Sequence, residues 1–228
     1  TLPVNAQAED QTSTSSGSST SSVTASTAAS WVNSDVQVIA FQQTWNTIAK
    51  ECKDTYGPED VGYVEVSPPQ ESIKGSSWWT SYQPVSYKLD SKLGTEAEFK
   101  NMITVCKAQG VGIIADVVMN NTAAPDNKGT FTGTNGSEYT PDAGSFPGFA
   151  TSTYPEGITA DDFHTCTDKI KDYTNQEEVQ QCRLLGMLDF DSESDKVQDI
   201  EADYMARMYN YGVLGFRIDA AKHINTDS

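Results

Sequence analysis

The residues "GFRIDAAKH", at positions 215–223, contain an arginine, an aspartate, a lysine and a histidine directly after an apolar run. Charged groups are costly to remove from water, so such a cluster needs compensating partners or a chemical task. Arg217 and Asp219 are two residues apart and would lie on the same face of a strand, where the guanidinium favours the ionised carboxylate. Asp219 is therefore either half of an internal ion pair or a reactive group.

A repeated order of strand and helix must position this cluster. Apolar, β-branched runs predict strands, and apolar residues at three- and four-residue spacing predict helices between them. The predicted strands cover residues 36–41, 61–67, 111–119 and 213–218, and the predicted helices cover 44–58, 95–110 and 197–212. Thr95 and Glu98 have the spacing of a capping box, and Gly110 stands at the expected C-terminal position. This order predicts an α/β fold with a parallel sheet, either doubly wound or a (β/α)8 barrel.

Two observations favour the barrel. Candidate polar or aromatic groups follow the strand ends, and barrel enzymes build their sites on that face. These groups are Glu71, Trp78, Trp79, Asn120 and Asp219. In addition, the first strand is not followed by the glycine-rich phosphate motif of a dinucleotide-binding fold. A complete barrel needs eight units and about 250 residues. The sequence therefore predicts about the first four βα units of a (β/α)8 TIM barrel.

Composition divides the chain into four parts. Residues 1–30 are rich in Ser and Thr and are expected to form a disordered linker. Residues 121–188 are rich in Gly, Thr, Asp and Pro, and a structureless loop of this length would be unusual inside a compact domain. We therefore expect a small inserted domain between the third strand and the third helix. Residues 31–120 and 189–228 would then be the first part of the barrel and its continued, truncated part.

Charge and cysteine content limit the function classes. The net charge of −17, from 32 acidic and 15 basic residues, argues against nucleic acid and anionic membranes as partners. The cysteines are Cys52, Cys106, Cys166 and Cys182, with no zinc-type spacing. Their even number favours a secreted, disulfide-bonded protein, and three pairings are open, of which Cys166 with Cys182 would close a local loop. Free thiols, and a cytosolic protein with a low-complexity tail, are the alternatives.

Five segments together carry a family resemblance. They are "VSPPQES" (66–72), "WWTSYQPVSYKL" (78–89), "DVVMNN" (116–121), "CRLLGMLDFD" (182–191) and "GFRIDAAKH" (215–223). In this order they resemble the α-amylases of the large retaining glycoside hydrolase family, in its animal and actinobacterial chloride-dependent type, over about residues 35–228. The resemblance implies a secreted, monomeric enzyme that cleaves internal α-1,4-glucosidic bonds of starch by a retaining double displacement, with no nucleic-acid or membrane partner.

The resemblance also implies roles for individual residues. Asp219 matches the nucleophile, and Arg217 matches both a residue that supports it and one ligand of an activating chloride. The implied glucan-binding residues are Trp78, Trp79, Tyr82, Gln83, Asn121, Lys222 and His223. Because large aromatic residues are usually buried, the two tryptophans could instead belong to a local core.

A structural Ca²⁺ is implied where the insert meets the barrel. Asn120 and Asp189 match its side-chain ligands, and both offer the hard oxygen atoms that Ca²⁺ prefers. The backbone carbonyls of Gln180 and His223 match the rest of the set. A loop cap at Asn120 and a turn at Asp189 are the alternatives.

Two departures from the family pattern bear on activity. The motif that usually ends Asn-His reads Asn120-Asn121 here, and asparagine is shorter than histidine and cannot carry a positive charge. The general acid of the family is expected beyond Ser228, so the 228 residues alone are expected to be inactive and poorly folded. A glucan transglycosylase of the same family and a non-catalytic glucan-binding protein are the alternative functions.

Overall fold

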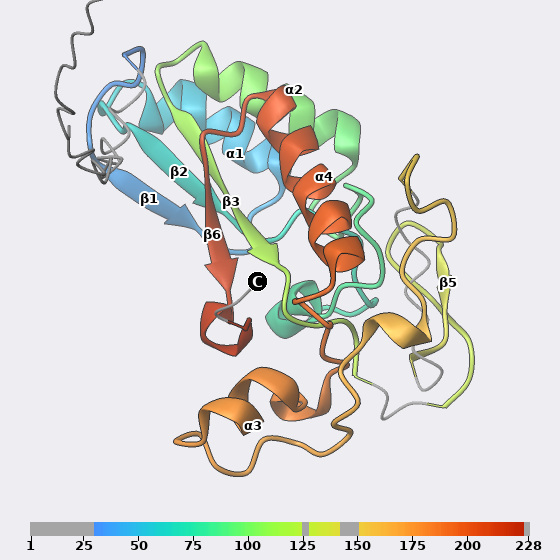
Figure 1. Cartoon of the computed structure of the whole chain (residues 1–228). Coiled ribbons are helices and arrows are strands. Elements are labelled where there is room, and N and C mark those ends of the chain that lie inside the picture. Colours follow the sequence, from blue (N-terminus) through green and yellow to red (C-terminus); the bar gives the residue numbers. More distant parts are fainter. Residues whose placement is uncertain (1–29, 125–127, 142–150, 226–228) are drawn as a thin grey trace, which may run out of the picture.

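The computed structural model describes residues 30–124, 128–141 and 151–225, so the predicted linker at 1–30 lies almost wholly outside the described residues. Four parallel strands form one sheet in the order β1-β2-β3-β6, and the main helices lie on one side of it (Figure 1). The strands are β1 (Gln37–Ala40), β2 (Tyr63–Val66), β3 (Gly112–Val118) and β6 (Gly215–Asp219), and the helices are α1 (Trp45–Glu51), α2 (Glu96–Lys107) and α4 (Asp195–Tyr211). The predicted parallel α/β sheet is confirmed.

Local signals in the sequence account for the helix ends. Thr95 and Glu98 form the predicted capping box, in which each side chain accepts a hydrogen bond from the other residue's backbone N–H. Gly110 and Gly212 have φ values of 74° and 106°, a left-handed conformation that favours glycine after a helix. The first predicted helix differs from expectation, because α1 ends at Glu51 and the chain continues as a π-helical turn, Cys52–Tyr56.

The core lies between the helices and the sheet. The three- and four-residue spacing of apolar residues that predicted the helix at 95–110 gives α2 a buried face, formed by Phe99, Met102, Ile103 and Cys106. Cys106 forms a disulfide with Cys52, which joins α2 to the turn after α1. Within the described residues, the structure has no helix long and apolar enough to cross a membrane.

The segment between β3 and α4 is built from short elements. Its strands β4 (Phe131–Thr132) and β5 (Glu138–Tyr139) pair in antiparallel fashion, and its helix α3 (Gln176–Gln181) precedes a 3-10 turn at Leu184–Gly186. The second disulfide joins Cys166 to Cys182, the local pairing considered above. Because each helix and strand here is so short, the sequence of this segment has little hydrophobic periodicity.

Glu71 has a different role from the one its position suggested. Its side chain is fully buried, and Oε1 accepts hydrogen bonds from the backbone N–H groups of Asn135 and Ser137 at 2.9 and 3.0 Å. Oε2 accepts a third hydrogen bond from Ser86 Oγ at 2.6 Å. Glu71 therefore anchors the β4–β5 hairpin to the loop after β2 instead of lining a site at the strand ends.

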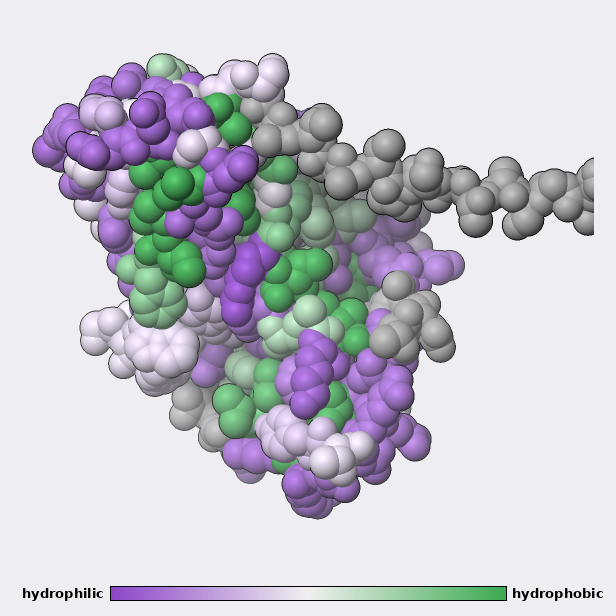
Figure 2. All heavy atoms as spheres, turned by 90° about the vertical axis from the view of Figure 1, so that its left-hand side faces the viewer, coloured by the Kyte–Doolittle hydropathy of each residue, from purple (hydrophilic) through white to green (hydrophobic). Residues whose placement is uncertain are grey.

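The two outer strands of the described sheet carry exposed apolar groups. β1 pairs with β2 and β6 pairs with β3, and Ile39 and Ile218 on these outer strands are 64% and 43% exposed. Figure 2 views the molecule from the side on which β1 lies and shows apolar residues exposed on that surface. Apolar residues on the strands of a complete parallel sheet are normally covered on both faces.

One acidic group is buried in the core. Glu201 of α4 accepts a hydrogen bond at 2.9 Å from Tyr87 Oη, and the Tyr87 ring stacks on Tyr204 with centroids 4.5 Å apart. Burial raises the pKa of Glu201 to about 8, although the hydrogen bond from Tyr87 opposes the shift. The Glu201 carboxyl therefore holds its proton to a higher pH than a solvated glutamate does.

We expect the chain to lose stability relative to a Glu201→Gln variant as the pH rises from 4.5 to about 8. The folded state binds this proton more tightly than the unfolded state, so the stabilising contribution is complete below pH 4.5 and is lost as the pH passes through the folded-state pKa. Glutamine keeps an acceptor for Tyr87 and cannot ionise. Urea unfolding at pH 5, 6.5 and 8 should show a difference that grows by a few kcal/mol, on the order of 1.4 kcal/mol per pKa unit.

The exposed Glu177→Gln provides the matched control, because its carboxylate is solvated in both states. Parallel stability curves for the chain and the Glu201→Gln variant would contradict the assignment of a raised pKa to Glu201.

Candidate active site

A cavity of about 530 Å³ opens at the carboxyl ends of the strands. Its walls come from the ends of β1 and β6, from the loop after β2 and from the 3-10 turn that follows α3. The lining residues are Phe41, Trp78, Trp79, Tyr82, Gln83, Leu184, Leu185, Met187, Arg217 and Asp219. The cavity thus brings together several predicted catalytic and glucan-binding residues that come from separate segments of the sequence.

Arg217 is the centre of a chain of polar contacts at this cavity. The register of β3 and β6 sets Asp116 opposite Arg217, whose Nη1 donates to both Asp116 oxygens at 2.9 and 3.0 Å. The same Nη1 donates to Asp219 Oδ1 at 2.6 Å, which confirms that the two residues share one face of the strand. Tyr82 Oη extends the chain by donating to Asp116 Oδ2 at 2.8 Å.

The burial of Asp116 governs the electrostatics of these polar contacts. Burial raises the pKa of Asp116 to about 6, although the hydrogen bonds from Arg217 and Tyr82 oppose that rise. Burial also raises the pKa of Tyr82, and the nearby Asp116 carboxylate adds to the effect. Burial disfavours the charge of Arg217, but hydrogen bonds to Asp116 and Asp219 outweigh it and raise the Arg217 pKa. Arg217 therefore stays charged beside Asp219 at every physiological pH.

Exposed aromatic rings form one wall of the cavity. Trp78 and Trp79 are 56% and 46% exposed, so they are not part of a local core. The Trp78 ring lies 5.9 Å from Phe41 and 5.8 Å from Tyr82, measured between centroids. Exposed aromatic faces with polar groups at their edges can pack against the apolar faces of sugar rings.

Three predicted glucan-binding residues are not among the described residues that line this cavity. Asn121 is 1% exposed, and its Nδ2 donates to the backbone oxygens of Tyr82 and Thr122 at 3.4 and 3.3 Å. After β6, a 3-10 turn (Ala221–His223) carries the chain toward α3. The Lys222 Nζ there lies 5.5 Å from the centroid of the Tyr173 ring, and the buried His223 pairs through Nδ1 with Val179 O at 3.0 Å. Their role in binding stays a prediction.

The residues predicted to bind Ca²⁺ lie together in two pairs. Asn120 and Asp189 are both buried, and Asn120 Nδ2 donates to Asp189 Oδ1 at 3.1 Å. Gln180 donates through Nε2 to Ile224 O, next to His223, which places the second pair where α3 meets the turn after β6. Two buried oxygen-bearing side chains in contact, one of them a carboxylate, fit a hard cation.

Sequence reasoning missed several residues of this region. Asp116 stood in a quoted motif without a role, although a carboxylate inside an apolar strand is itself a signal of a buried partner. Phe41, Leu184, Leu185 and Met187 gave no signal, because apolar residues at turns look like ordinary packing residues. His164 also gave none, and its Nδ1 lies 2.7 Å from Asp189 Oδ2.

Enzymes built on (β/α)8 barrels carry their active sites at the carboxyl ends of the strands, and retaining glycosidases use a carboxylate as nucleophile. Residues 67–228 match the family described as "Alpha amylase, catalytic domain". The chain belongs to this family of glycoside hydrolases.

Individual relatives agree with the family match. The alpha-amylase of Streptomyces violaceus is 42% identical over 190 residues, covering 83% of this chain and 31% of the relative. The alpha-amylase-related protein of Drosophila melanogaster is 40% identical over 200 residues, covering 86% and 38%. A solved structure of alpha-amylase I from Eisenia fetida superposes with a TM-score of 0.77 and 35% identity, covering 85% of this chain and 39% of that one. A variant of that enzyme was solved in complex with maltohexaose. The chain spans about a third of the length of the curated relatives it matches.

We expect the replacement Arg217→Met to raise the pKa of Asp116 further above about 6. Arg217 and Tyr82 at present oppose the effect of burial, so removal of the guanidinium leaves burial less compensated. A ¹³C NMR titration of the aspartate carboxyl groups between pH 4 and 9 measures the shift. Lys222→Met removes a cation that lies on Tyr173 and should leave the Asp116 titration unchanged. An unchanged or lowered Asp116 pKa in Arg217→Met would contradict the proposed balance.

Proposed function

We propose that this chain carries the nucleophile half of an α-amylase active site, for endohydrolysis of α-1,4-glucosidic bonds in starch. The observation that supports it best is the Asp219 carboxylate, which lines an aromatic-walled cavity and pairs with Arg217 at 2.6 Å. Family membership and the relatives named as alpha-amylases support the same reaction.

In the proposed reaction, Asp219 attacks the anomeric carbon as the glycosidic C–O bond breaks, and the leaving oxygen takes a proton from the general acid. Water, deprotonated by the same group, then hydrolyses the glycosyl–Asp219 ester and frees the carboxylate. The Arg217 guanidinium holds one oxygen of Asp219 and keeps it aligned. Asp116 and Tyr82 position Arg217 in turn, through the contacts of 2.8 to 3.0 Å described above. The exposed faces of Trp78 and Trp79 would hold neighbouring sugar units.

A retaining mechanism also needs a carboxylic acid about 5 Å from the nucleophile. Among the described residues that line the cavity, Asp219 is the sole carboxylate. The acid is therefore proposed to come from a part of the enzyme outside these residues. This arrangement also suits the proposed barrel, in which further βα units would cover the exposed apolar residues of β1 and β6.

The proposed Ca²⁺ would be held by the side chains of Asn120 and Asp189 and by the backbone carbonyls of Gln180 and His223. Bound there, the ion would join residues 121–188, the proposed inserted domain, to the ends of β3 and β6. Its role would be structural, because the described residues that line the cavity include none of these four. A chloride ion at Arg217 and secretion of the protein, which its two disulfides favour, complete the proposal.

A non-catalytic glucan-binding protein is the second candidate, and Asn121 is the observation that favours it. Its amide is turned to backbone oxygens, so it cannot replace a histidine that donates to the sugar in that conformation. The intact contact between Arg217 and Asp219 favours the enzyme instead. Transglycosylation would use the same residues, and analysis of the products from a maltooligosaccharide separates it from hydrolysis.

We expect soluble starch to be hydrolysed only by a longer protein that contains this chain. In that protein, Asp219→Asn should lower the rate by at least about a thousandfold, because asparagine cannot act as the nucleophile. The assay compares the 228-residue chain and the product of its full reading frame, each with and without the Asp219→Asn replacement. Asp203→Asn, on the exposed face of α4, is the matched control. Starch binding without hydrolysis by the long form would support the non-catalytic alternative.

We expect Trp79→Ala to weaken maltohexaose binding about fivefold, because loss of one aromatic–sugar contact costs on the order of 1 kcal/mol. Isothermal titration calorimetry measures the affinity, and circular dichroism confirms that the variant is folded. Tyr209→Ala removes an aromatic ring that is 67% exposed on α4 and should leave the affinity unchanged. Equal affinities of the unchanged protein, Trp79→Ala and Tyr209→Ala would show that Trp79 is not part of the binding site.

A further inference from the structure

A second polar cluster lies where residues 162–164 run beside residues 189–191, outside the cavity. The backbones are held together by two hydrogen bonds of 3.0 Å, from His164 N–H to Asp189 O and from Asp191 N–H to Asp162 O. Between them, the rings of Phe163 and Phe190 stack with centroids 5.1 Å apart. Side chains that project from this paired backbone are therefore held in fixed relative positions.

Three side chains converge there. His164 Nε2 lies 2.8 Å from Glu193 Oε2 and 3.7 Å from Asp191 Oδ1, and the three atoms all lie within 4.8 Å of one another. A tetrahedral ion with bonds of about 2.0–2.1 Å holds neighbouring ligand atoms about 3.3 Å apart. The two distances from the imidazole nitrogen lie on either side of this value, so small side-chain rotations would bring all three atoms onto one ion.

The other side of the imidazole ring fixes its orientation. His164 Nδ1 lies 2.7 Å from Oδ2 of Asp189, and Asp189 is itself held by Asn120 through Oδ1. A carboxylate at one ring nitrogen orients a histidine and directs the lone pair of the other nitrogen toward a metal. The His164 side chain is 7% exposed, whereas Asp191 and Glu193 are 40% and 29% exposed, which leaves an entry path from solvent.

We propose that His164, Asp191 and Glu193 bind a divalent transition-metal ion of the Zn²⁺ class, with water as the remaining ligand. One imidazole and two carboxylates suit Zn²⁺, whereas Ca²⁺ and Mg²⁺ take oxygen ligands. The site has its own ligands and meets the proposed Ca²⁺ ligands at Asp189, which His164 contacts through its ring and its backbone N–H.

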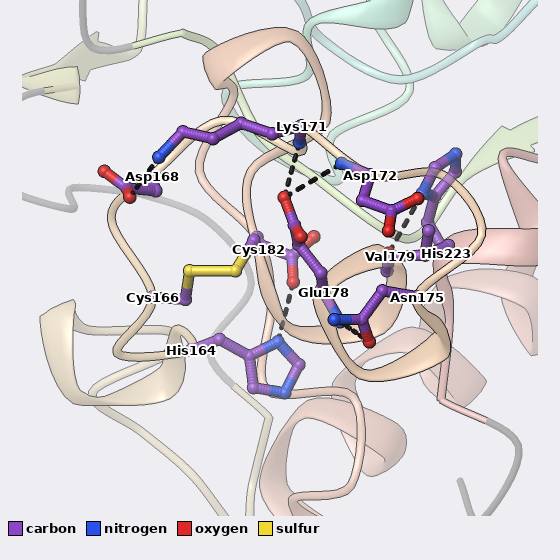
Figure 3. The surroundings of a disulfide bond; sticks show 11 residues. His164, Cys166, Asp168, Lys171, Asp172, Asn175, Glu178, Val179, Cys182 and His223 are labelled. Atoms are coloured by element: carbon purple, nitrogen blue, oxygen red, sulfur yellow. Dashed lines mark hydrogen bonds and ion pairs between the residues drawn. A yellow bond between two sulfur atoms is a disulfide. The ribbon is translucent and has the colours of Figure 1, made fainter.

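The proposed ion would act as a cross-link. It would tie the segment that carries His164 to the residues just before α4. Figure 3 shows His164 close to the Cys166–Cys182 disulfide. Metal and disulfide would then hold neighbouring points of the same irregular region. Because the ligands do not line the cavity, the site would stabilise the fold without taking part in sugar chemistry.

The test is Zn²⁺ titration of the 228-residue chain by calorimetry, after removal of metals with EDTA and dialysis into buffer that contains Ca²⁺ to occupy oxygen-ligand sites. We expect one equivalent of Zn²⁺ to bind. Co²⁺ should give the visible absorption bands of a four-coordinate site. Glu193→Gln and His164→Gln should each weaken Zn²⁺ binding by more than about 100-fold, because even outer partners of a metal ligand contribute 10- to 100-fold.

Two controls address the remaining polar groups. Glu177→Gln changes an exposed carboxylate on α3, and Asp161→Asn changes an exposed carboxylate beside the cluster. Both variants should bind Zn²⁺ as the unchanged chain does, and circular dichroism checks that each variant is folded. Zn²⁺ should also raise the melting temperature of the unchanged chain but not that of Glu193→Gln. Sub-stoichiometric binding, or equal binding by folded Glu193→Gln, would overturn the proposal.

Discussion

The site depends on the guanidinium group of Arg217, because one nitrogen of this side chain contacts both Asp116 and Asp219. The contact with Asp116 requires the parallel register of β3 and β6, which sets that residue directly opposite Arg217. The pairing of two strands that are about a hundred residues apart in sequence therefore helps to determine where the carboxylate of Asp219 points. Burial raises the pKa of Asp116, and its hydrogen bonds with Arg217 hold the guanidinium beside Asp219.

Polar contacts help to attach residues 121–188 to this sheet, in addition to apolar residues such as Ile158 that join the main core. Glu71 binds backbone N–H groups of the β4–β5 hairpin, while Asn120, at the end of β3, contacts Asp189. His164 then connects Asp189 to Glu193 just before α4. Buried charges of this kind specify one arrangement strongly, since any other leaves them without partners. Such contacts suit a region whose own helices and strands are short.

The sequence was most informative where local chemistry decides the structure. The capping box at Thr95, the glycines at 110 and 212 and the apolar face of α2 each follow from residues within one or two turns, and the structure confirms them. The shared face of Arg217 and Asp219 also follows from strand geometry alone. By contrast, the partners of His164 and Glu71 lie tens of residues away, so no local pattern could identify them. The role of Asp116 needed the strand register, which no single segment contains.

The exposed edges of the sheet have a consequence for how copies of this chain behave in solution. Unpaired strand edges with apolar residues, as at Ile39 and Ile218, are templates for edge-to-edge aggregation. The net charge of −17 opposes that encounter by mutual repulsion, which acts over a distance that shrinks from about 30 Å at 0.01 M salt to about 10 Å at 0.1 M. Colloidal stability of the isolated chain should therefore decrease as salt is added, contrary to the behaviour of a protein whose strand edges are covered.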